Sequence, residues 1–319
     1  MARFQTIIAI AAGLLALSGP ASAQSGRTVK LIVPAPPGAS TDFVARLSAD
    51  HISRTQGLTA VVENRAGANG MIGVEAVSRA APDGNTLLVT ANTYLLDDLL
   101  RKPSYHPVTS FEPVCFLVQT PAVLVVNSAS PYRTLKDLLD AAKAKPGELS
   151  VAAVGPGSTF QLGLIELTRK AGVNMIYVPY AGSAPAVTAA LGNHVTAAIS
   201  GYAVVVEQIK AGKLRALASG TAKRIEPQPE LPTFDESGFK GLEIDNFFGV
   251  VAPAKTPKAT LAQLGSWFTA ALQAPESKTK LAAQYLYTGG ACGDPYGAYL
   301  RGRHDEYGKA IRDANIKVQ

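Results

Sequence analysis

The chain contains 319 residues, of which 47% are hydrophobic and 17% are charged, and its formal net charge is +6. This length suits two domains of ordinary size, each with a well-developed apolar core. The positive charge is spread along the chain, without a block of Lys and Arg and without basic residues interleaved with aromatic ones. That distribution argues against nucleic-acid binding and supports only a mild preference for anionic ligands.

Residues 1–23 have the pattern of a secretory signal peptide. Arg3 provides a basic start, residues 7–17 form an apolar run, and an Ala-Ser-Ala segment at residues 21–23 fits a cleavage site. The apolar run is too short to span a bilayer, although an uncleaved N-terminal anchor is the alternative. We therefore expect an exported protein whose mature chain begins near Gln24.

Strand-like and helix-like segments alternate along the rest of the chain. This alternation is typical of parallel sheets covered by helices, so we expect an α/β fold with two parallel-type sheets flanked by helices. The predicted strands cover residues 29–33, 60–63, 86–90, 115–118, 122–126, 151–153, 175–178, 197–200 and 216–219. The predicted helices cover residues 42–54, 70–80, 134–145, 160–171, 185–191, 260–274, 278–287 and 295–315.

The pattern changes twice, near residues 121–132 and near residues 247–257. Two such changes predict a chain that crosses between two lobes and returns. Domain one would then contain residues 24–126 and 247–319, and domain two residues 127–246. Ligands of two-lobed α/β proteins bind in the cleft at the carboxyl ends of the strands. A single continuous domain is the alternative.

Two strand-to-helix connections share one design, in which a Pro-Gly turn is followed by hydroxyl residues able to cap a helix. The free N–H groups and the dipole at the start of a helix attract anions, so the pair predicts a carboxylate held between two lobes. Taken singly, each connection is equally consistent with a stiff turn. The residues concerned are Pro37, Gly38, Ala39, Ser40 and Thr41 in the first connection and Gly157, Ser158 and Thr159 in the second.

The other signals indicate binding rather than catalysis. The chain lacks the G-x-S-x-G, P-loop and H-E-x-x-H motifs, and its four histidines are scattered singly. We therefore expect no enzyme activity, no cofactor and no metal site. Cys115 and Cys292 are the two cysteines, and they either form a disulfide, as exported proteins permit, or remain two buried thiols.

A series of landmarks in the same order resembles the solute-binding proteins of tripartite tricarboxylate transporters, the Bug family, over nearly the whole mature length. The first landmarks are Val29-Lys30-Leu31-Ile32-Val33-Pro34, Pro36-Pro37-Gly38-Ala39-Ser40-Thr41-Asp42 and Val62-Glu63-Asn64-Arg65-Ala66-Gly67-Ala68-Asn69-Gly70. The later ones are Ala80-Ala81-Pro82-Asp83-Gly84, Val178-Pro179-Tyr180-Ala181-Gly182, Ala211-Gly212-Lys213-Leu214-Arg215-Ala216-Leu217, Leu231-Pro232-Thr233, Glu236-Ser237-Gly238, Phe248-Gly249 and Ala252-Pro253.

The resemblance implies a two-lobed periplasmic binding protein that closes over a small organic acid. We expect a monomer that binds a mono- or dicarboxylate. Aromatic side chains could line the pocket for an aromatic acid, although core packing is the alternative use of most of them. The resemblance also implies delivery of the ligand to membrane permease subunits. A ligand-loaded sensor subunit and an exported hydrolase using Ser40 or Ser158 are the alternatives. The complete set of expected ligand-binding residues is Pro37, Gly38, Ala39, Ser40, Thr41, Thr93, Gly157, Ser158, Thr159, Gln161, Tyr180, Gly182, Ser200 and Phe247.

Three positions depart from the family pattern. Ala35 replaces a common Phe, Gln161 replaces a frequent His, and Ser200 stands where amino-acid-binding members often have Asp. A buried ammonium group without that Asp would lack a partner. The departures therefore favour a carboxylate without an amino group.

Overall fold

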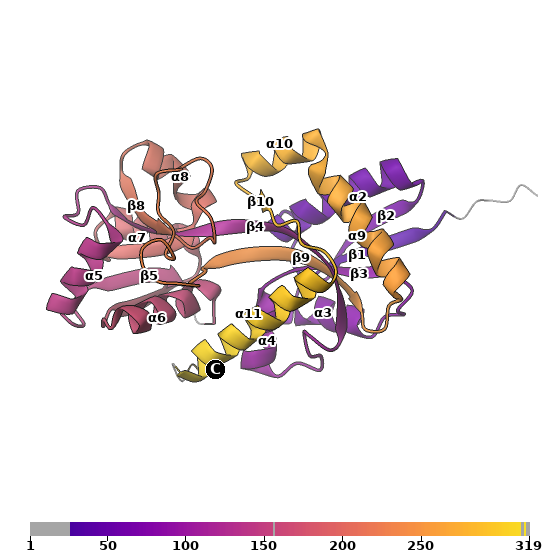
Figure 1. Ribbon diagram of the computed structural model, residues 1–319, viewed down its shortest axis with the longest axis horizontal. Coiled ribbons are helices and arrows are strands. Elements are labelled where there is room, and N and C mark those ends of the chain that lie inside the picture. The colour runs from indigo at the N-terminus through magenta and orange to yellow at the C-terminus, as the bar shows by residue number, and fades with distance from the viewer. Residues whose placement is uncertain (1–25, 156, 314–315, 317–319) are drawn as a thin grey trace, which may run out of the picture.

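The computed structural model describes residues 26–155, 157–313 and 316, which form two lobes joined side by side (Figure 1). The predicted signal peptide lies outside these residues. Within the described part of the chain, no helix is both long enough and apolar enough to cross a bilayer.

Within the described residues, one mixed sheet of ten strands runs through both lobes in the order β2-β1-β3-β9-β4-β7-β5-β6, with β8 and β10 paired to β4. The first lobe contains β1 (Thr28–Val33), β2 (Thr59–Asn64), β3 (Thr86–Ala91) and β10 (Tyr287–Thr288). The second contains β5 (Ser150–Val154), β6 (Ile176–Tyr180), β7 (Ala197–Gly201) and β8 (Leu214–Ser219). The long strands β4 (Phe111–Asn127) and β9 (Asp245–Pro253) cross the middle of the molecule (Figure 1).

The α/β, two-lobed architecture predicted from the sequence is confirmed, but the sheet is mixed rather than parallel throughout. The pairs β1–β2, β1–β3, β5–β6 and β5–β7 are parallel, as expected for strands connected through helices. Every pair that involves β4 or β9 is antiparallel. The difference arises because these two strands carry the chain from one lobe to the other and back.

Strand β4 is continuous where the sequence predicted two strands. Its first part pairs with β9 as far as Pro121, which lies opposite Asp245, and its second part pairs with β7 from Ala122, opposite Gly201. Pro121 has no N–H to donate, and it occupies the point at which the hydrogen-bond ladder changes partners. The proline therefore marks the junction between the lobes without ending the strand.

Helices cover both faces of the sheet in each lobe. In the first lobe α2 (Ser40–Gln56) and α9 (Lys258–Gln273) pack on one face, and α3 (Met71–Ser78), α4 (Thr93–Arg101) and α11 (Asp294–Asp313) pack on the other. In the second lobe the two faces are covered by α5 (Leu135–Ala144) with α6 (Thr159–Ala171), and by α7 (Ser183–Leu191) with α8 (Tyr202–Lys210). The short helix η1 (Ala68–Gly70) precedes α3, and α10 (Pro275–Ala283) follows α9.

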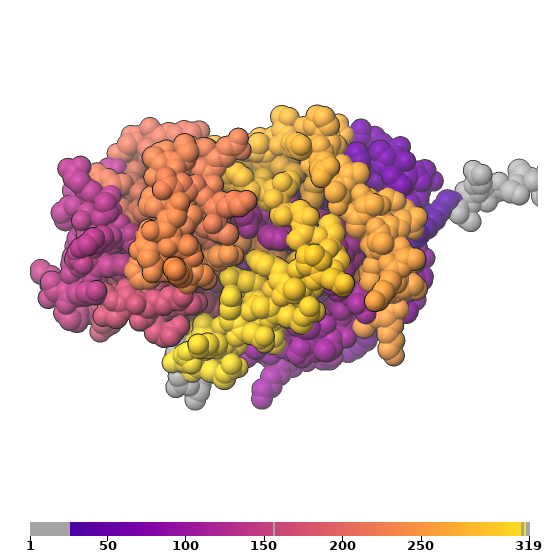
Figure 2. Space-filling view, in the orientation of Figure 1, coloured from indigo at the N-terminus to yellow at the C-terminus, as the bar shows by residue number. Residues whose placement is uncertain are grey.

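The C-terminal helices run across one face of the molecule, where α11 crosses the middle and extends below the second lobe (Figure 2). Cys115 of β4 and Cys292, just before α11, form a disulfide. The bridge therefore fastens the start of α11 to the strand that both lobes share.

Candidate functional site

The first Pro-Gly connection joins β1 to α2 and is organised by the side chain of Asp42. Gly38 adopts a positive φ of 85°, which favours glycine, and its N–H donates to Asp42 Oδ2 at 2.9 Å. The predicted hydroxyl cap is wrong here, because the N-cap residue is Ala39 and no side chain caps the helix. The Asp42 carboxylate instead holds the amide of Gly38, which lies before the helix, because the turn at Gly38 brings that amide within its reach.

Asp42 is nearly inaccessible, with 3% of its surface exposed, and its carboxylate is fully engaged. Arg46 Nε donates to Oδ2 and Asn64 Nδ2 donates to Oδ1, both at 2.9 Å. Asn64 also donates to the carbonyl of Ala35, which ties the loop to β2. Burial raises the pKa of Asp42, but the hydrogen bonds from Arg46, Gly38 and Asn64 outweigh it and hold the pKa below its ordinary value.

The second connection joins β5 to α6 and has the predicted hydroxyl cap. Ser158 is the N-cap residue, and its Oγ accepts from the Gln161 N–H at 3.2 Å and donates to the carbonyl of Val154 at 2.8 Å. Gly157 adopts a positive φ of 79°, and its N–H donates to Gln161 Oε1 at 2.8 Å. Gln161, expected at the distal end of the ligand, therefore holds its own loop in this structure.

The two loops consequently share a feature that the sequence analysis missed. In each, the third residue of the helix, Asp42 or Gln161, reaches back to the amide of the glycine that precedes the N-cap. The side chain that accepts this hydrogen bond is charged in the first lobe and neutral in the second. In the described part of the chain, the N–H groups of Ser40 and Thr41 have no hydrogen-bond partner, as expected at the start of an uncapped helix.

Both lobes contact the same short segment of β9, at the junction marked by Pro121. From the end of β3, the Asn92 N–H donates to the carbonyl of Phe247 at 3.3 Å and its Nδ2 donates to the carbonyl of Asp245 at 3.0 Å. From the start of α6, Thr159 Oγ1 donates to Asn246 Oδ1 at 2.9 Å. The carboxyl ends of the strands of both lobes are thus directed to one place.

The other predicted site residues occupy different environments. Thr93, at the start of α4, is exposed, whereas Tyr180 and Gly182, at the end of β6, are half-buried. Ser200 is fully buried on β7 opposite Val123 of β4. Phe247 is also fully buried, and it packs edge-on against Phe116 and Tyr299 in the core of the first lobe.

A buried polar network lies beneath the junction, and no sequence pattern predicted it. Asp245, 1% exposed, lies 3.6 Å from Nη2 of Arg303 on α11, which also donates to the hydroxyl of Tyr307 at 3.1 Å. Asn92 Nδ2 reaches the same hydroxyl at 3.4 Å. Burial raises the pKa of Asp245 to about 6, although the positive charge of Arg303 opposes this shift.

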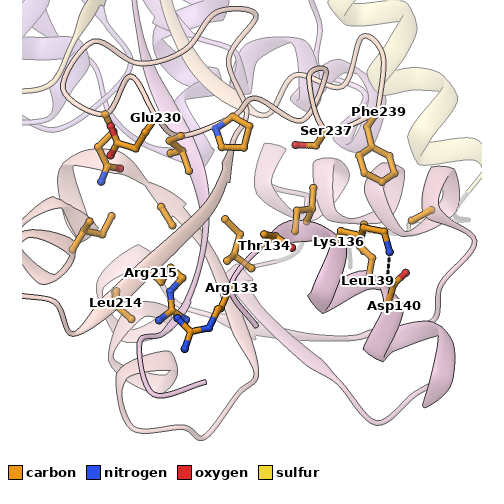
Figure 3. A pocket seen from close by; sticks show the side chains of 18 of the residues that line it. Arg133, Thr134, Lys136, Leu139, Asp140, Leu214, Arg215, Glu230, Ser237 and Phe239 are labelled. Atoms are coloured by element: carbon orange, nitrogen blue, oxygen red, sulfur yellow. Dashed lines mark hydrogen bonds and ion pairs between the residues drawn. The ribbon is translucent and has the colours of Figure 1, made fainter. Parts of the chain in front are cut away.

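A cavity of about 950 Å³ lies away from the junction. It lies in the second lobe between α5, β8 and residues 228–239, and none of the predicted ligand-binding residues lines it (Figure 3). Two of its basic side chains are already engaged, because Arg215 donates to the carbonyls of Ser128 and Tyr132, and Lys136 pairs with Asp140. The cavity therefore has fewer free basic side chains for binding an acid than its lining suggests.

The sequence predicted four isolated histidines, but two of them lie together in the structure. His106 and His304 lie together with Asp98 on the first lobe, and these three residues could hold a metal ion.

Two α/β lobes that share crossing strands, with helix starts from both lobes directed to the junction, define the class of binding proteins that hold a small ligand between lobes. Residues 44–288 match the model of the tripartite tricarboxylate transporter family receptor. The chain belongs to this family of solute-binding receptors.

Individual relatives agree with this assignment. Protein BugT of Bordetella pertussis is 33% identical, and the match covers 100% of this chain and 99% of BugT. The structure of the periplasmic binding protein BugD is 32% identical with a TM-score of 0.69, over 92% of this chain and 99% of that one. A Rhodopseudomonas palustris protein solved with adipate is 31% identical with a TM-score of 0.73, over 91% of this chain and 98% of that one.

Proposed function

We propose that this chain captures a small organic carboxylate between its lobes in the periplasm and delivers it to the membrane subunits of a tripartite tricarboxylate-type transporter. The observation that carries the proposal is the convergence of both lobes on residues 245–247 of β9, through Asn92 and Thr159. We assign one lobe to residues 24–126 and 247–319 and the other to residues 127–246, with β4 and β9 as the connections that bend when the lobes close.

One ligand carboxylate would be bound by the two loops. Ser40 is exposed and is not used as a cap, so its hydroxyl and the free N–H groups of Ser40 and Thr41 are available as donors. From the second lobe we propose Gly157, Ser158 and Thr159. None of these residues is charged, so the anion would be held by dipoles and hydroxyl groups, and affinity should depend only weakly on ionic strength.

The far end of the ligand would be shaped by Tyr180 and Gly182, together with Thr93. Ser200 is fully buried here and would contact the ligand only when lobe closure exposes the end of β7. Because adipate is bound by a relative, a linear dicarboxylate is the first ligand class to test. Ser200 supplies no negative charge, so an amino group on the ligand would be buried without a counter-ion. We therefore propose an acid without an amino group.

Ser158 has no role as a nucleophile in this proposal. Its hydroxyl already donates to the Val154 carbonyl and accepts from the Gln161 amide, which is the geometry of a helix cap. An activated serine would instead need a base within hydrogen-bond reach.

The test is a ligand screen on protein stripped of bound acids by unfolding and refolding. We expect adipate or a related dicarboxylate to raise the thermal midpoint, because a ligand of the native state stabilises it. The corresponding 2-amino acid should bind less tightly. Ser40→Ala should weaken binding by about tenfold in calorimetry, the effect of one lost hydrogen bond to a charged group. Ser266→Ala, on the exposed surface of α9, is the matched control.

A panel of mono- and dicarboxylates that fails to raise the thermal midpoint would overturn the proposal. Equal affinities in the Ser40→Ala and Ser266→Ala variants would leave carboxylate capture in place but remove the first loop from the site.

A further inference from the structure

Three potential metal-binding side chains from separate segments meet on the first lobe. Asp98 lies on α4, His106 in the connection between α4 and β4, and His304 on α11. One ligand atom from each lies within 4.8 Å of the other two. The packing of α11 against α4 brings them together. Because His304 is far from the other two in the sequence, no local pattern predicts the group.

The group is partly ordered by its own contacts. His304 Nε2 lies 2.9 Å from Asp98 Oδ2, and the two side chains are 15% and 19% exposed. The ring of His106 lies beside that of His304, with 5.3 Å between the ring centroids. Two imidazoles and a carboxylate therefore face a small shared volume at the protein surface.

The backbone that carries His106 is held on both sides. Its N–H donates to Ser110 Oγ at 3.0 Å, and its carbonyl accepts from the Ser110 N–H at 2.9 Å. The preceding Tyr105 is buried, and its hydroxyl donates to the carbonyl of Tyr94 at 3.4 Å. The turn that carries His106 is thus held in place by these contacts, which reduces the entropy lost when its ring is immobilised.

We propose that Asp98, His106 and His304 form a binding site for a divalent transition-metal ion of the zinc type. Imidazole nitrogen with carboxylate oxygen is a ligand set that zinc accepts, and three protein ligands leave a fourth position for water. The bond lengths of about 2.0–2.2 Å that zinc requires would draw the three atoms closer together. Exposure of the His106 side chain allows this movement.

Binding requires two changes in hydrogen bonding. His304 Nε2 donates to the Asp98 carboxylate at 2.9 Å, so its proton must be released or moved to Nδ1 before a metal can replace it between the two groups. The Val108 N–H donates to His106 Nδ1 at 3.2 Å, which places the proton of the neutral ring on Nε2. A metal needs a ring nitrogen that carries no proton, so His106 must give up this hydrogen bond, for example by a half-turn of its ring. The contact lies at the surface, where water can satisfy the released amide.

Such an ion would join α4 to α11 at a place separate from the junction. The neighbouring residue, Arg303, points instead to the buried Asp245. The ion would therefore add a cross-link between two helices of the first lobe and would not contact the ligand proposed above.

The experiment uses the mature chain, prepared without a histidine tag and treated with a chelator. Titration with Zn²⁺ in a calorimeter should give one ion per chain and a higher thermal midpoint, and Co²⁺ should give the absorption spectrum of a His-ligated ion. His106→Ala and His304→Ala should abolish these effects. Asp98→Asn, which keeps an oxygen near His304, should weaken binding by at least about tenfold.

The matched control is His194→Gln, which removes an imidazole that lies outside this group. Circular dichroism and thermal denaturation without metal establish that each variant is folded, and both should match the parent protein. The proposal is overturned if Zn²⁺ does not bind the parent chain, or if it binds His106→Ala and His304→Ala as tightly as His194→Gln. Either outcome is independent of carboxylate capture.

Discussion

Asp42 and Gln161 perform the same structural task with different charges. Each lies at the third position of its helix and accepts a hydrogen bond from the glycine amide before the N-cap. This is a variant of the capping box, in which the side chain at that position returns to the backbone. In both lobes, the helix start that follows the Pro-Gly connection is therefore fixed by its own first turn.

The first prediction concerns Asp42. Asp42→Asn keeps an oxygen for one donor but loses the charge that binds Arg46, and it should lower the free energy of unfolding by about 1–3 kcal/mol. Because the folded-state pKa of Asp42 is below its ordinary value, its contribution is present above pH 4 and is lost as the pH falls through the folded-state value. Chemical denaturation between about pH 3 and pH 7 measures both effects. A variant that matched the parent protein across this range would contradict them.

The second prediction concerns Asp245, whose contribution to stability changes with pH in the opposite direction. Its pKa is raised from 3.8 to about 6, so the folded state binds the proton more tightly than the unfolded state does. The associated stability is fully present below the unfolded-state pKa and is lost as the pH rises towards 6. Asp245→Asn should therefore remove a decline in unfolding free energy between about pH 4 and pH 6. An unchanged pH profile in the variant would argue that Asp245 stays ionised.

At the scale of elements, the Phe248-Gly249 landmark is explained by the helix that crosses it. A Cβ atom on Gly249 would lie 1.9 Å from the hydroxyl oxygen of Tyr296 on α11, so this helix packs directly on the backbone of β9. Tyr296 is fully buried, and its ring stacks near Phe116. The glycine therefore permits α11 to cross the strand that joins the lobes.

Gly249→Ala should consequently displace α11 and lower the free energy of unfolding by about 1–3 kcal/mol, as overpacking of a core does. Thermal denaturation measures the loss. The double variant with Tyr296→Phe removes the clashing oxygen and should recover part of it. Gly302→Ala is the control, because a Cβ at this position on α11 meets nothing within 4 Å. Equal stability of Gly249→Ala and Gly302→Ala would show that the helix has room to move.

Most elements followed from the sequence, and the exceptions have physical causes. Helices α4 and α8 were not predicted. Each starts directly at the end of a strand, after Asn92 or Gly201, and no side chain caps it. Strand β4 was divided at Pro121, because local rules treat an internal proline as a break. Its continuity depends on the partners β9 and β7, which lie far away in the sequence.

At the scale of the whole molecule, the sequence indicated the lobes and both helix starts, because those depend on local residues such as Gly38 and Ser158. It did not indicate the Asp245–Arg303 network or the group formed by Asp98 and His304. These pairs join the middle or early part of the chain to α11, and no spacing rule connects them. The role of Gln161 was also missed, since a side chain that reaches back to an amide leaves no pattern of its own.

The path of the chain through the shared sheet also has a consequence for the order of folding. The second lobe needs only β4 and the residues up to 244, whereas the first lobe needs β9 between β3 and β4, followed by α9 and α11. Contacts between distant parts of a chain form slowly. In pulsed hydrogen exchange during refolding, amides of β5 and β7 should gain protection before those of β1 and β3. Simultaneous protection would contradict this order. The first lobe contains the earliest strands of the chain, and yet it would be the last to be completed.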